Sequence, residues 1–464
     1  IFSYSQVKDI GLPEIKNFKK TDYQSGTQNW GIDQDKNGNL YFANNKGLLQ
    51  FDGTNWHNYT VPNTQNVRCV KVDDDTGRIY VSGYNEFGYF ESNSQGNLTY
   101  VSLRQLVLKK DFDVADFIWK IHIYKDEVIF QSFQKAFIFK NNKIHTLNAP
   151  TRFQFSFSVD NKLYFQDMER GILQYQNSTL TPLKGTEVLN NSEVWGIFSL
   201  PNNRLLIATL ENGVFVYDNK KISAWDSDAN KFIKKNSSLG GAKINDQLLV
   251  LNSVLDGVII CDVDGKIIQH INLKKGLQNN TVLSSFIDGK NNLWLGLDNG
   301  ISFININSPF TFFGSGLNFS TVYASVVHNG YLYVATNQGV FYHNLDGLIK
   351  DDSFKLVVGT TSQSWNIQVI GNELVCSNNR GVLIIKGNKT VKILDSSGYF
   401  GLKDMPSNSK FVIGSNYSGF ALFKKTKDGL VYKNKINGFD KSSNFFEIDN
   451  NYLCLKRDRF LYQM

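Results

Sequence analysis

Residues 29–53 of the 464-residue chain read NWGIDQDKNGNLYFANNKGLLQFDG. A segment that alternates between apolar and polar residues is followed by a polar turn, a second apolar segment, a turn that ends at Gly47 and a third apolar segment. Alternation with a period of two residues is typical of β-strands, and clusters of Asp, Asn and Gly are typical of the turns between them. The stretch therefore predicts three antiparallel strands joined by tight turns.

The same frame recurs along the chain, which makes it an internal repeat. Further copies occupy residues 194–218, 282–305, 322–342 and 365–386. A glycine after the second strand marks the register in most copies: Gly47, Gly88, Gly171, Gly213, Gly257, Gly300, Gly339, Gly381 and Gly419, with Ala136 in the third copy. Gly47 and Gly300 are 253 residues apart over six intervals, so the repeat is about 42 residues long. That length is typical of a four-stranded blade of a β-propeller.

The apolar pattern supports an all-β propeller independently of the period. The second strand of a copy, for example Leu40–Ala43 or Leu293–Gly296, is apolar on both faces. A strand needs two apolar faces only where both faces of its sheet are covered, as between two neighbouring blades. A fourth strand is expected after most copies, at Trp56–Tyr59, Leu98–Val101, Lys221–Ala224 and Phe310–Phe313. We expect the recurring glycine to supply a positive φ at the turn into the third strand.

The number of copies determines the predicted domains. Ten copies are complete, and an eleventh runs from Phe445–Ile448 to Phe460–Tyr462 without an outer strand. A single ring usually has four to eight blades. We therefore expect a seven-bladed propeller at residues 1–307 and the first blades of a second, truncated propeller at residues 308–464. Closing the second ring would take about three more blades, so we expect the chain to be part of a longer protein.

The repeat resembles a known family. Its frame, together with Gln28–Trp30 and the segments Gly11–Tyr23 and Gly47–Gly53, is similar to the two-component regulator propeller repeat of bacterial sensor proteins with a double propeller. The resemblance implies an extracytoplasmic, periplasmic region of an inner-membrane protein. It also implies a triple-tyrosine immunoglobulin-like domain, a transmembrane helix and a cytoplasmic output module further along. The output module is a histidine kinase in some members of the family and a DNA-binding helix-turn-helix in others.

Composition excludes several other classes of protein. The net charge is +7, and the lysines are scattered rather than grouped, which disfavours nucleic-acid binding by this region. No stretch approaches 18 consecutive apolar residues, so no transmembrane helix is expected within the chain. The cysteines are widely spaced inside apolar runs and are expected to be small buried residues: Cys69, Cys261, Cys376 and Cys454. The six histidines are not paired, so we predict neither a metal site nor a cofactor.

Motifs for catalysis are equally sparse. Asp33–Gly38 matches the first half of a calcium loop, but Asn44 stands where such a loop has a bidentate Glu, so we interpret the segment as a hairpin turn. The chain contains no serine-nucleophile elbow, phosphate loop or zinc-protease motif. Asp116, Glu193 and Asp404 are expected near the starts of inner strands, where they could face a central funnel, and a glycosidase would need two such carboxylates close together. We expect no enzymatic activity in this region; any kinase activity would belong to a downstream domain.

A ligand site is expected at one end of the inner strands. Aromatic residues recur where the first strand of a copy begins, and we interpret them first as packing between blades: Trp30, Trp119, Trp195, Tyr323 and Trp365. The residues at or beside these positions differ from blade to blade, which is what a ligand-binding rim requires. The predicted ligand-binding residues are Asn29, Arg68, Trp119, Gln154 and Glu193.

These observations predict the ligand-sensing region of a bacterial transmembrane signalling or transcription regulator. The family resemblance implies an oligosaccharide or related nutrient as the small-molecule ligand, and the aromatic rim suits sugar rings. A homodimer is a possible assembly, and contact with the membrane is expected only through a downstream segment. Two alternatives stay open: a propeller polysaccharide lyase or glycosidase, and a scaffold for protein–protein interaction.

Overall fold

The computed structural model describes residues 7–8, 11–64, 66–108, 116–313, 319–345, 354–442, 446–449, 452–455 and 460–463. Antiparallel sheets dominate it, so the all-β prediction is confirmed. By packing, the chain divides into two compact units, Ile1–Gly314 and Ser315–Met464. The domain boundary predicted at residues 307/308 stays a prediction. No helix in these ranges is long and apolar enough to span a bilayer.

The first unit contains seven four-stranded sheets, which we number blades 1 to 7. Blade 1 comprises β2 (Asn29–Gln34), β3 (Leu40–Asn44), β4 (Gly47–Phe51) and β5 (Trp56–Tyr59). Blade 2 comprises β6 (Val67–Asp73), β7 (Arg78–Gly83), β8 (Phe87–Ser92) and β9 (Leu98–Ser102). Blade 3 comprises β10 (Ile118–Tyr124), β11 (Glu127–Ser132), β12 (Lys135–Lys140) and β13 (Lys143–Asn148). Blade 4 comprises β14 (Phe153–Val159), β15 (Lys162–Asp167), β16 (Gly171–Gln176) and β17 (Thr179–Pro182).

Blade 5 comprises β18 (Val194–Leu200), β19 (Arg204–Thr209), β20 (Val214–Tyr217) and β21 (Ile222–Ala224). Blade 6 comprises β22 (Ser238–Lys243), β23 (Leu248–Ser253), β24 (Val258–Asp262) and β25 (Ile267–Ile271). Blade 7 comprises β26 (Val282–Ile287), β27 (Leu293–Leu297), β28 (Gly300–Asn305) and, from the N-terminal region, β1 (Glu14–Phe18). The helical segments of the unit are α1 (Lys20–Tyr23), α2 (Asp228–Asn236), η1 (Arg104–Leu106), η3 (Glu187–Leu189) and η4 (Leu273–Lys275).

The second unit repeats the same sheet, and we number its sheets 8 to 11. Sheet 8 comprises β29 (Val322–His328), β30 (Tyr331–Thr336), β31 (Gly339–Asn344) and β32 (Lys355–Leu356). Sheet 9 comprises β33 (Ser364–Ile370), β34 (Glu373–Asn378), β35 (Gly381–Lys386) and β36 (Lys389–Ile393). Sheet 10 comprises β37 (Tyr399–Asp404), β38 (Phe411–Asn416), β39 (Gly419–Thr426) and β40 (Gly429–Ile436). Sheet 11 comprises β41 (Phe446–Asp449), β42 (Tyr452–Leu455) and β43 (Phe460–Gln463).

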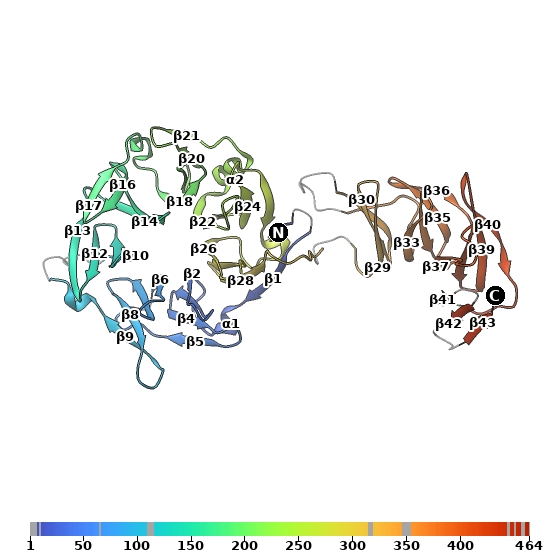
Figure 1. Ribbon diagram of the computed structural model, residues 1–464, viewed down its shortest axis with the longest axis horizontal. Helices are drawn as coiled ribbons and strands as arrows, with labels where there is room; N and C mark the ends of the chain where they lie inside the picture. The colour runs from blue at the N-terminus through green and yellow to red at the C-terminus, as the bar shows by residue number, and fades with distance from the viewer. Residues whose placement is uncertain are drawn as a thin grey trace. The chain divides into compact units, whose positions relative to one another are not determined.

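The seven blades of the first unit form a ring (Figure 1). The first strand of each blade lies toward the middle of the ring and packs against the first strand of the next blade. The series of contacts closes on itself: β2–β6, β6–β10, β10–β14, β14–β18, β18–β22, β22–β26 and β26–β2. One end of the ring therefore collects one strand start from every blade.

The N-terminal region, rather than the segment after blade 7, completes that blade. β1 pairs antiparallel with β28, and Phe18 lies opposite Ile301. Phe18 is 6% exposed and packs against the rings of Phe51, Trp56 and Trp294. The prediction of an outer strand at Phe310–Phe313 is wrong. In this segment Phe312 makes only an isolated β-bridge with Leu12. The first and last blades of a ring can pair only after the ring has closed. Local sequence therefore does not reveal which strand completes blade 7.

The apolar second strands behave as expected. All five residues of β3 and all five of β27 are buried between neighbouring blades, and a fully buried large apolar side chain contributes about 1.5–3 kcal/mol. Eight of the nine register glycines have a positive φ, the exception being Gly88. At Gly257 and Gly381 a Cβ would also lie 2.1 Å and 1.9 Å from a backbone carbonyl oxygen of the fourth-strand side. Only glycine fits these two turns without displacing the backbone.

Candidate functional site

A β-bulge occurs at the start of every inner strand of the ring. In β2, Asn29 pairs with Asn44 and Gly31 pairs with Ala43, so Trp30 has no partner in the ladder. The same irregularity leaves one or two residues unpaired in each of the seven blades: Trp30, Arg68, Trp119, Gln154 with Phe155, Trp195, Leu239 with Gly240, and Leu283. A bulge re-aims side chains at the rim of a sheet or barrel. Each blade thus presents its bulge residue at the same end of the ring.

Arg68 of blade 2 lies among the aromatic rings of its neighbours. Its guanidinium carbon is 4.5 Å from the centre of the Trp30 ring, 5.0 Å from that of Phe117 and 5.4 Å from that of Trp119. The rings of Trp30 and Trp119 are themselves 5.8 Å apart and meet edge to face. Residues of blades 1, 2 and 3 therefore converge at the mouth of the ring.

The aromatic surface continues as far as blade 5. The Trp119 ring lies 5.7 Å from Phe133 and 5.8 Å from Phe155. Phe155 in turn meets Trp195 edge to face at 4.9 Å. We call this set the rim cluster: Trp30, Arg68, Phe117, Trp119, Phe133, Phe155 and Trp195. Phe155 is buried and the other members are partly exposed, so the cluster is accessible at its edge.

Polar neighbours orient two of the indoles. Trp30 Nε1 donates to Gln28 Oε1 at 3.2 Å, and Gln28 Nε2 donates to Asp298 Oδ1 of blade 7 at 2.7 Å. Trp195 Nε1 donates to Glu193 Oε2 at 3.2 Å. By contrast, Trp119 Nε1, Arg68 Nε and Arg68 Nη1 are buried without an acceptor among the described residues. Buried donors are nearly always hydrogen-bonded in proteins, which makes these three nitrogens exceptional.

The side chains just inside the mouth carry mainly positive charge. Lys71 Nζ lies 2.8 Å from Asp33 Oδ2, which also accepts the Val72 N–H. Lys120 Nζ lies 4.9 Å from the centre of the Phe155 ring, and burial lowers the pKa of this lysine. Burial, with Lys120 and Lys71 nearby, lowers the pKa of His122 to about 3, so this imidazole is neutral at neutral pH.

The predicted site residues fall into three groups. Arg68 and Trp119 belong to the rim cluster. Glu193 orients Trp195, and Gln154 is buried beside Phe155 at the bulge of blade 4, where its carbonyl accepts from Gln131 Nε2. Whether any of them binds a ligand stays a prediction.

Asn29 lies in the seam between blades 1 and 7, and its role in ligand binding stays a prediction. It is fully buried, its amide donates to the Gly300 carbonyl at 3.0 Å, and its side-chain oxygen accepts from Asn44 Nδ2 at 2.8 Å. Asn29 therefore joins blade 1 to blade 7, and Trp30 takes its place at the mouth. Adjacent residues of a strand point to opposite sides. A prediction that is shifted by one residue therefore selects Asn29 in place of Trp30.

The remaining members of the cluster have weaker signals in the sequence. Trp30 and Trp195 are predicted to pack between blades, and both contact rings of other blades: Trp30 meets Trp119 of blade 3, and Trp195 meets Phe155 of blade 4. Phe117 precedes β10, and Phe133 lies in the turn after β11. No repeat position distinguishes either of these two phenylalanines, although both contact Trp119 within blade 3.

The carboxylates considered for catalysis have structural partners. Asp116 accepts the backbone N–H groups of Phe117 at 2.7 Å and Phe133 at 3.2 Å. Glu193 accepts from Trp195, and Asp404 of the second unit pairs with Lys425 at 2.7 Å. Through these contacts each of the three carboxylates holds a neighbouring element in place.

The expected hairpin turn at residues 33–38 is confirmed. Asp35 Oδ1 accepts the backbone N–H groups of Asn37 and Asn39, both at 2.9 Å, and Asp35 N–H donates to the Asn39 carbonyl. A polar hollow of about 320 Å³ lies beside this turn, between blades 1 and 2. Of the two carboxylates that line it, Asp35 is bound by the turn, and Asp74 Oδ1 accepts the Lys36 N–H at 2.9 Å.

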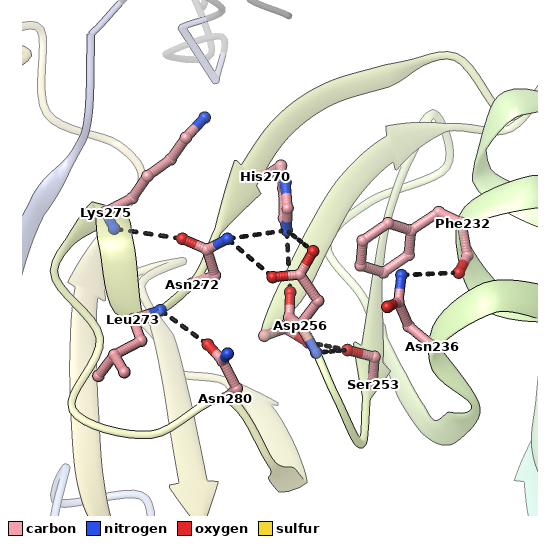
Figure 2. Close-up of polar contacts among 10 residues, drawn as sticks. Phe232, Asn236, Ser253, Asp256, His270, Asn272, Leu273, Lys275 and Asn280 are labelled. Carbon is pink, nitrogen blue, oxygen red and sulfur yellow. Dashed lines mark hydrogen bonds and ion pairs between the residues drawn. The ribbon is translucent and has the colours of Figure 1, made fainter. Parts of the chain in front are cut away.

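A serine, a histidine and an aspartate lie close together in blade 6 (Figure 2). His270 Nε2 is 3.4 Å from Asp256 Oδ2, and Asn272 Nδ2 donates to Asp256 Oδ1 at 2.8 Å. Ser253 Oγ, however, accepts the Asp256 N–H and donates to the Gly257 carbonyl at 2.9 Å. The serine hydroxyl is thus committed to the backbone, and the group fixes the turn between β23 and β24 rather than forming a catalytic triad.

Comparison with known proteins adds the fold relationship. No family model and no curated protein sequence matches the chain. The extracellular domain of a protein classed as a hybrid two-component system from B. thetaiotaomicron is similar in structure, with a TM-score of 0.66 and 15% sequence identity over 98% of this chain and 66% of that one. The extracellular domain of a one-component system from the same organism gives a TM-score of 0.51 and 16% identity over 97% and 67% of the two chains.

An enzyme is also similar in structure. Streptogramin B lyase gives a TM-score of 0.50 and 15% identity over 63% of this chain and 98% of its own. At such identities a likeness shows a shared fold. The expected resemblance to extracytoplasmic sensor propellers is thus confirmed at the level of the fold. The chain spans 66% of the length of the hybrid system's extracellular domain.

Proposed function

We propose that the chain is the ligand-sensing, extracytoplasmic region of a bacterial transmembrane signalling or transcription regulator. The rim cluster carries the proposal, because five consecutive blades contribute side chains to one accessible surface. The fold shared with extracellular domains of signalling systems supports it. A periplasmic location follows from the same proposal, and cell fractionation of the native protein tests it.

An oligosaccharide or related nutrient is the ligand that suits the cluster. The half-buried rings of Trp30, Trp119 and Trp195 offer apolar surface for the faces of sugar rings. Arg68 and the indole N–H of Trp119 offer donors that replace water on the ligand's oxygen atoms. Such a combination of aromatic faces and a few polar groups is typical of small-molecule sites.

Calorimetric titration of the chain against a panel of oligosaccharides tests the proposal. Trp119→Ala and Trp195→Ala should each weaken binding by about 1–3 kcal/mol, as the loss of an aromatic anchor does, with the circular-dichroism spectrum unchanged. Trp365→Ala is the matched control, because Trp365 occupies the corresponding bulge of sheet 9 in the second unit. Binding that is weakened by Trp365→Ala but by neither rim variant would contradict a site at the mouth of the ring.

An enzyme on this fold is the second candidate function, because streptogramin B lyase shares the fold. It predicts that a bound oligosaccharide is consumed, which chromatography of the titrated sample detects. A homodimer is likewise proposed, and sedimentation equilibrium of the chain measures it.

A further inference from the structure

Three positively charged side chains contact the rim cluster without a carboxylate partner among the described residues. Arg68 lies over Trp30, Lys120 over Phe155 and Arg152 over Phe133, at 4.5, 4.9 and 5.0 Å. Within the described ranges none of the three forms an ion pair, whereas Lys71 is paired with Asp33. The mouth of the ring therefore has an excess of positive charge in a partly apolar setting, where it is weakly screened.

Of the three cations, Arg68 has buried nitrogens without a hydrogen-bond acceptor among the described residues. Two of its nitrogens, and Trp119 Nε1 beside it, are buried without an acceptor among the described residues. A buried donor that lacks an acceptor costs about 1–3 kcal/mol, and more when the group is charged. Stacking on three aromatic faces satisfies the flat sides of the guanidinium. Its edge stays available for an acceptor that carries negative charge.

The acidic side chains near the cluster do not fill this role. Both Asp116 oxygens accept backbone N–H groups, and Glu193 accepts from Trp195. Burial lowers the pKa of the Arg68 guanidinium, as expected for a cation that no nearby carboxylate compensates. Because no described residue supplies the acceptor, we assign this role to the ligand.

We propose that the ligand bound at the rim cluster carries an anionic group, a carboxylate or a sulfate ester, that Arg68 binds at its guanidinium edge. The inference rests on the proposed ligand-sensing function and adds the charge of the ligand. An acidic oligosaccharide fits all the groups present: its rings stack on the tryptophans, and its charged substituent meets Arg68 with the field of Lys120 behind it.

The test compares four probes by calorimetry and by Trp and Arg side-chain NMR of the ¹⁵N-labelled chain. The probes are oligogalacturonate, chondroitin sulfate oligosaccharides, neutral maltohexaose and sodium sulfate. We expect at least one acidic oligosaccharide to bind about tenfold or more tightly than maltohexaose, with shifts of the Trp119 Nε1–H and Arg68 Nε–H signals. The affinity should fall between about 20 mM and 200 mM NaCl. Galacturonate and chondroitin sulfate distinguish the carboxylate from the sulfate ester, and binding of sodium sulfate alone would show that the site accepts a free anion.

Arg68→Gln should reduce the affinity for the acidic oligosaccharide about tenfold or more, a larger loss than for a neutral one, while Arg68→Lys should retain part of the preference. Arg204→Gln is the matched control, since Arg204 lies at the opposite end of the strands in blade 5. Equal affinity for acidic and neutral oligosaccharides, with binding still sensitive to Trp195→Ala, would overturn the anionic ligand and leave the proposed function standing. If none of the probes shifts the Trp119 or Arg68 signals, both the anionic ligand and the mouth of the ring as the site are overturned.

Discussion

The two units place aromatic residues at the same bulge position of their inner strands but differ in the polar partners of these residues. In the second unit the bulges fall on Tyr323, Trp365 and Phe400, as they fall on Trp30, Trp119 and Trp195 in the first. Tyr323 and Trp365 are 5.0 Å apart, and Trp365 and Phe400 are 5.4 Å apart. The second unit thus repeats the aromatic contacts between neighbouring sheets.

The polar groups of these two clusters differ. Trp365 Nε1 donates to Asn379 Oδ1 and to the Tyr417 hydroxyl, both at 3.0 Å, and Gln363 Nε2 donates to the Tyr323 hydroxyl at 2.8 Å. The indole of the second unit is therefore satisfied from within, whereas Trp119 and Arg68 of the first unit are not. The repeat thus determines where a rim side chain stands, and blade-specific residues decide whether its polar atoms find a partner among the described residues.

The two units also differ in how their first inner strands are packed. The inner strand β2 packs against β6 on one side and β26 on the other, while β29, the first inner strand of the second unit, has no buried residue. In the first unit β1 supplies the outer strand that closes the ring. Variants of each unit test these differences, and we give those with the largest expected effect first.

Phe18→Ala should destabilise the first unit by about 3–5 kcal/mol, because it empties an aromatic site at the seam of the ring. Chemical unfolding followed by tryptophan fluorescence measures the change. A Trp365→Phe background confines the signal to the first unit, since Trp365 is the one tryptophan after residue 314. Phe310→Ala is the control: Phe310 is 72% exposed and should change stability by less than about 0.5 kcal/mol. Equal effects of the two variants would show that β1 does not hold the ring closed.

Gly257→Ala and Gly381→Ala should each cost about 1–3 kcal/mol or more, one in each unit. At both positions φ is positive and a Cβ would collide with a backbone carbonyl oxygen. Gly387→Ala is the control, because its φ is +58° but nothing lies within 4 Å of the added Cβ. Thermal unfolding of the three variants compares them. A Gly381→Ala effect no larger than that of Gly387→Ala would mean that the second unit uses the repeat glycine differently.

Removing His122 should flatten the acid limb of the first unit's stability curve. The unfolded chain binds a proton at His122 below its ordinary pKa of about 6.5, whereas the folded pKa is about 3. Between these values the unfolded state holds more protons, so stability falls as the pH falls, by up to about 1.4 kcal/mol per pH unit. Unfolding of His122→Asn from pH 6.5 to 4 should lose this one-proton slope, with His145→Asn in the same blade as control. A slope that is the same in the wild type and in His122→Asn would contradict a neutral, buried His122.

A chelator should have the smallest effect. The described parts of both units contain no group of three or more His, Cys, Asp or Glu residues that could hold a metal ion. We expect EDTA to leave the melting temperature of each unit within the error of calorimetry. A clear drop in only one unit would reveal a structural metal there and set that unit apart from its repeat partner.

Much of the fold could be predicted because it is local. The strands, the hairpin turn at Asp35 and the register glycines follow from alternation, turn residues and period, and each is confirmed. The buried strands β3 and β27 follow from their double apolar faces. Cys261 and Cys376 are buried, and burial raises the pKa of each thiol to about 12, as for small apolar residues that take no part in redox chemistry; the side chain of Cys454 lies outside the described residues.

The candidate site could be predicted only in part. Arg68 and Trp119 follow from their repeat position, but Asn29 was placed one residue away from Trp30. Phe117 and Phe133 are outside the repeat frame and meet Trp119 within blade 3. An inserted bulge leaves the alternation of the flanking residues almost unchanged in sequence, yet it decides which of two adjacent side chains faces the mouth.

By itself, then, the sequence determined the sheet, its turns and the spacing of the blades, because hydrophobic alternation and glycine conformation act over a few residues. The tertiary structure decided which strand closes blade 7, since β1 and the segment at Phe310–Phe313 are both short and apolar in part. It chose β1 because Phe18 is buried among Phe51, Trp56 and Trp294, while Phe310 and Phe312 stay exposed. The tertiary structure also places Arg68 among aromatic rings, where two of its nitrogens have no acceptor among the described residues. This environment is assembled from three blades that meet only when the ring is closed.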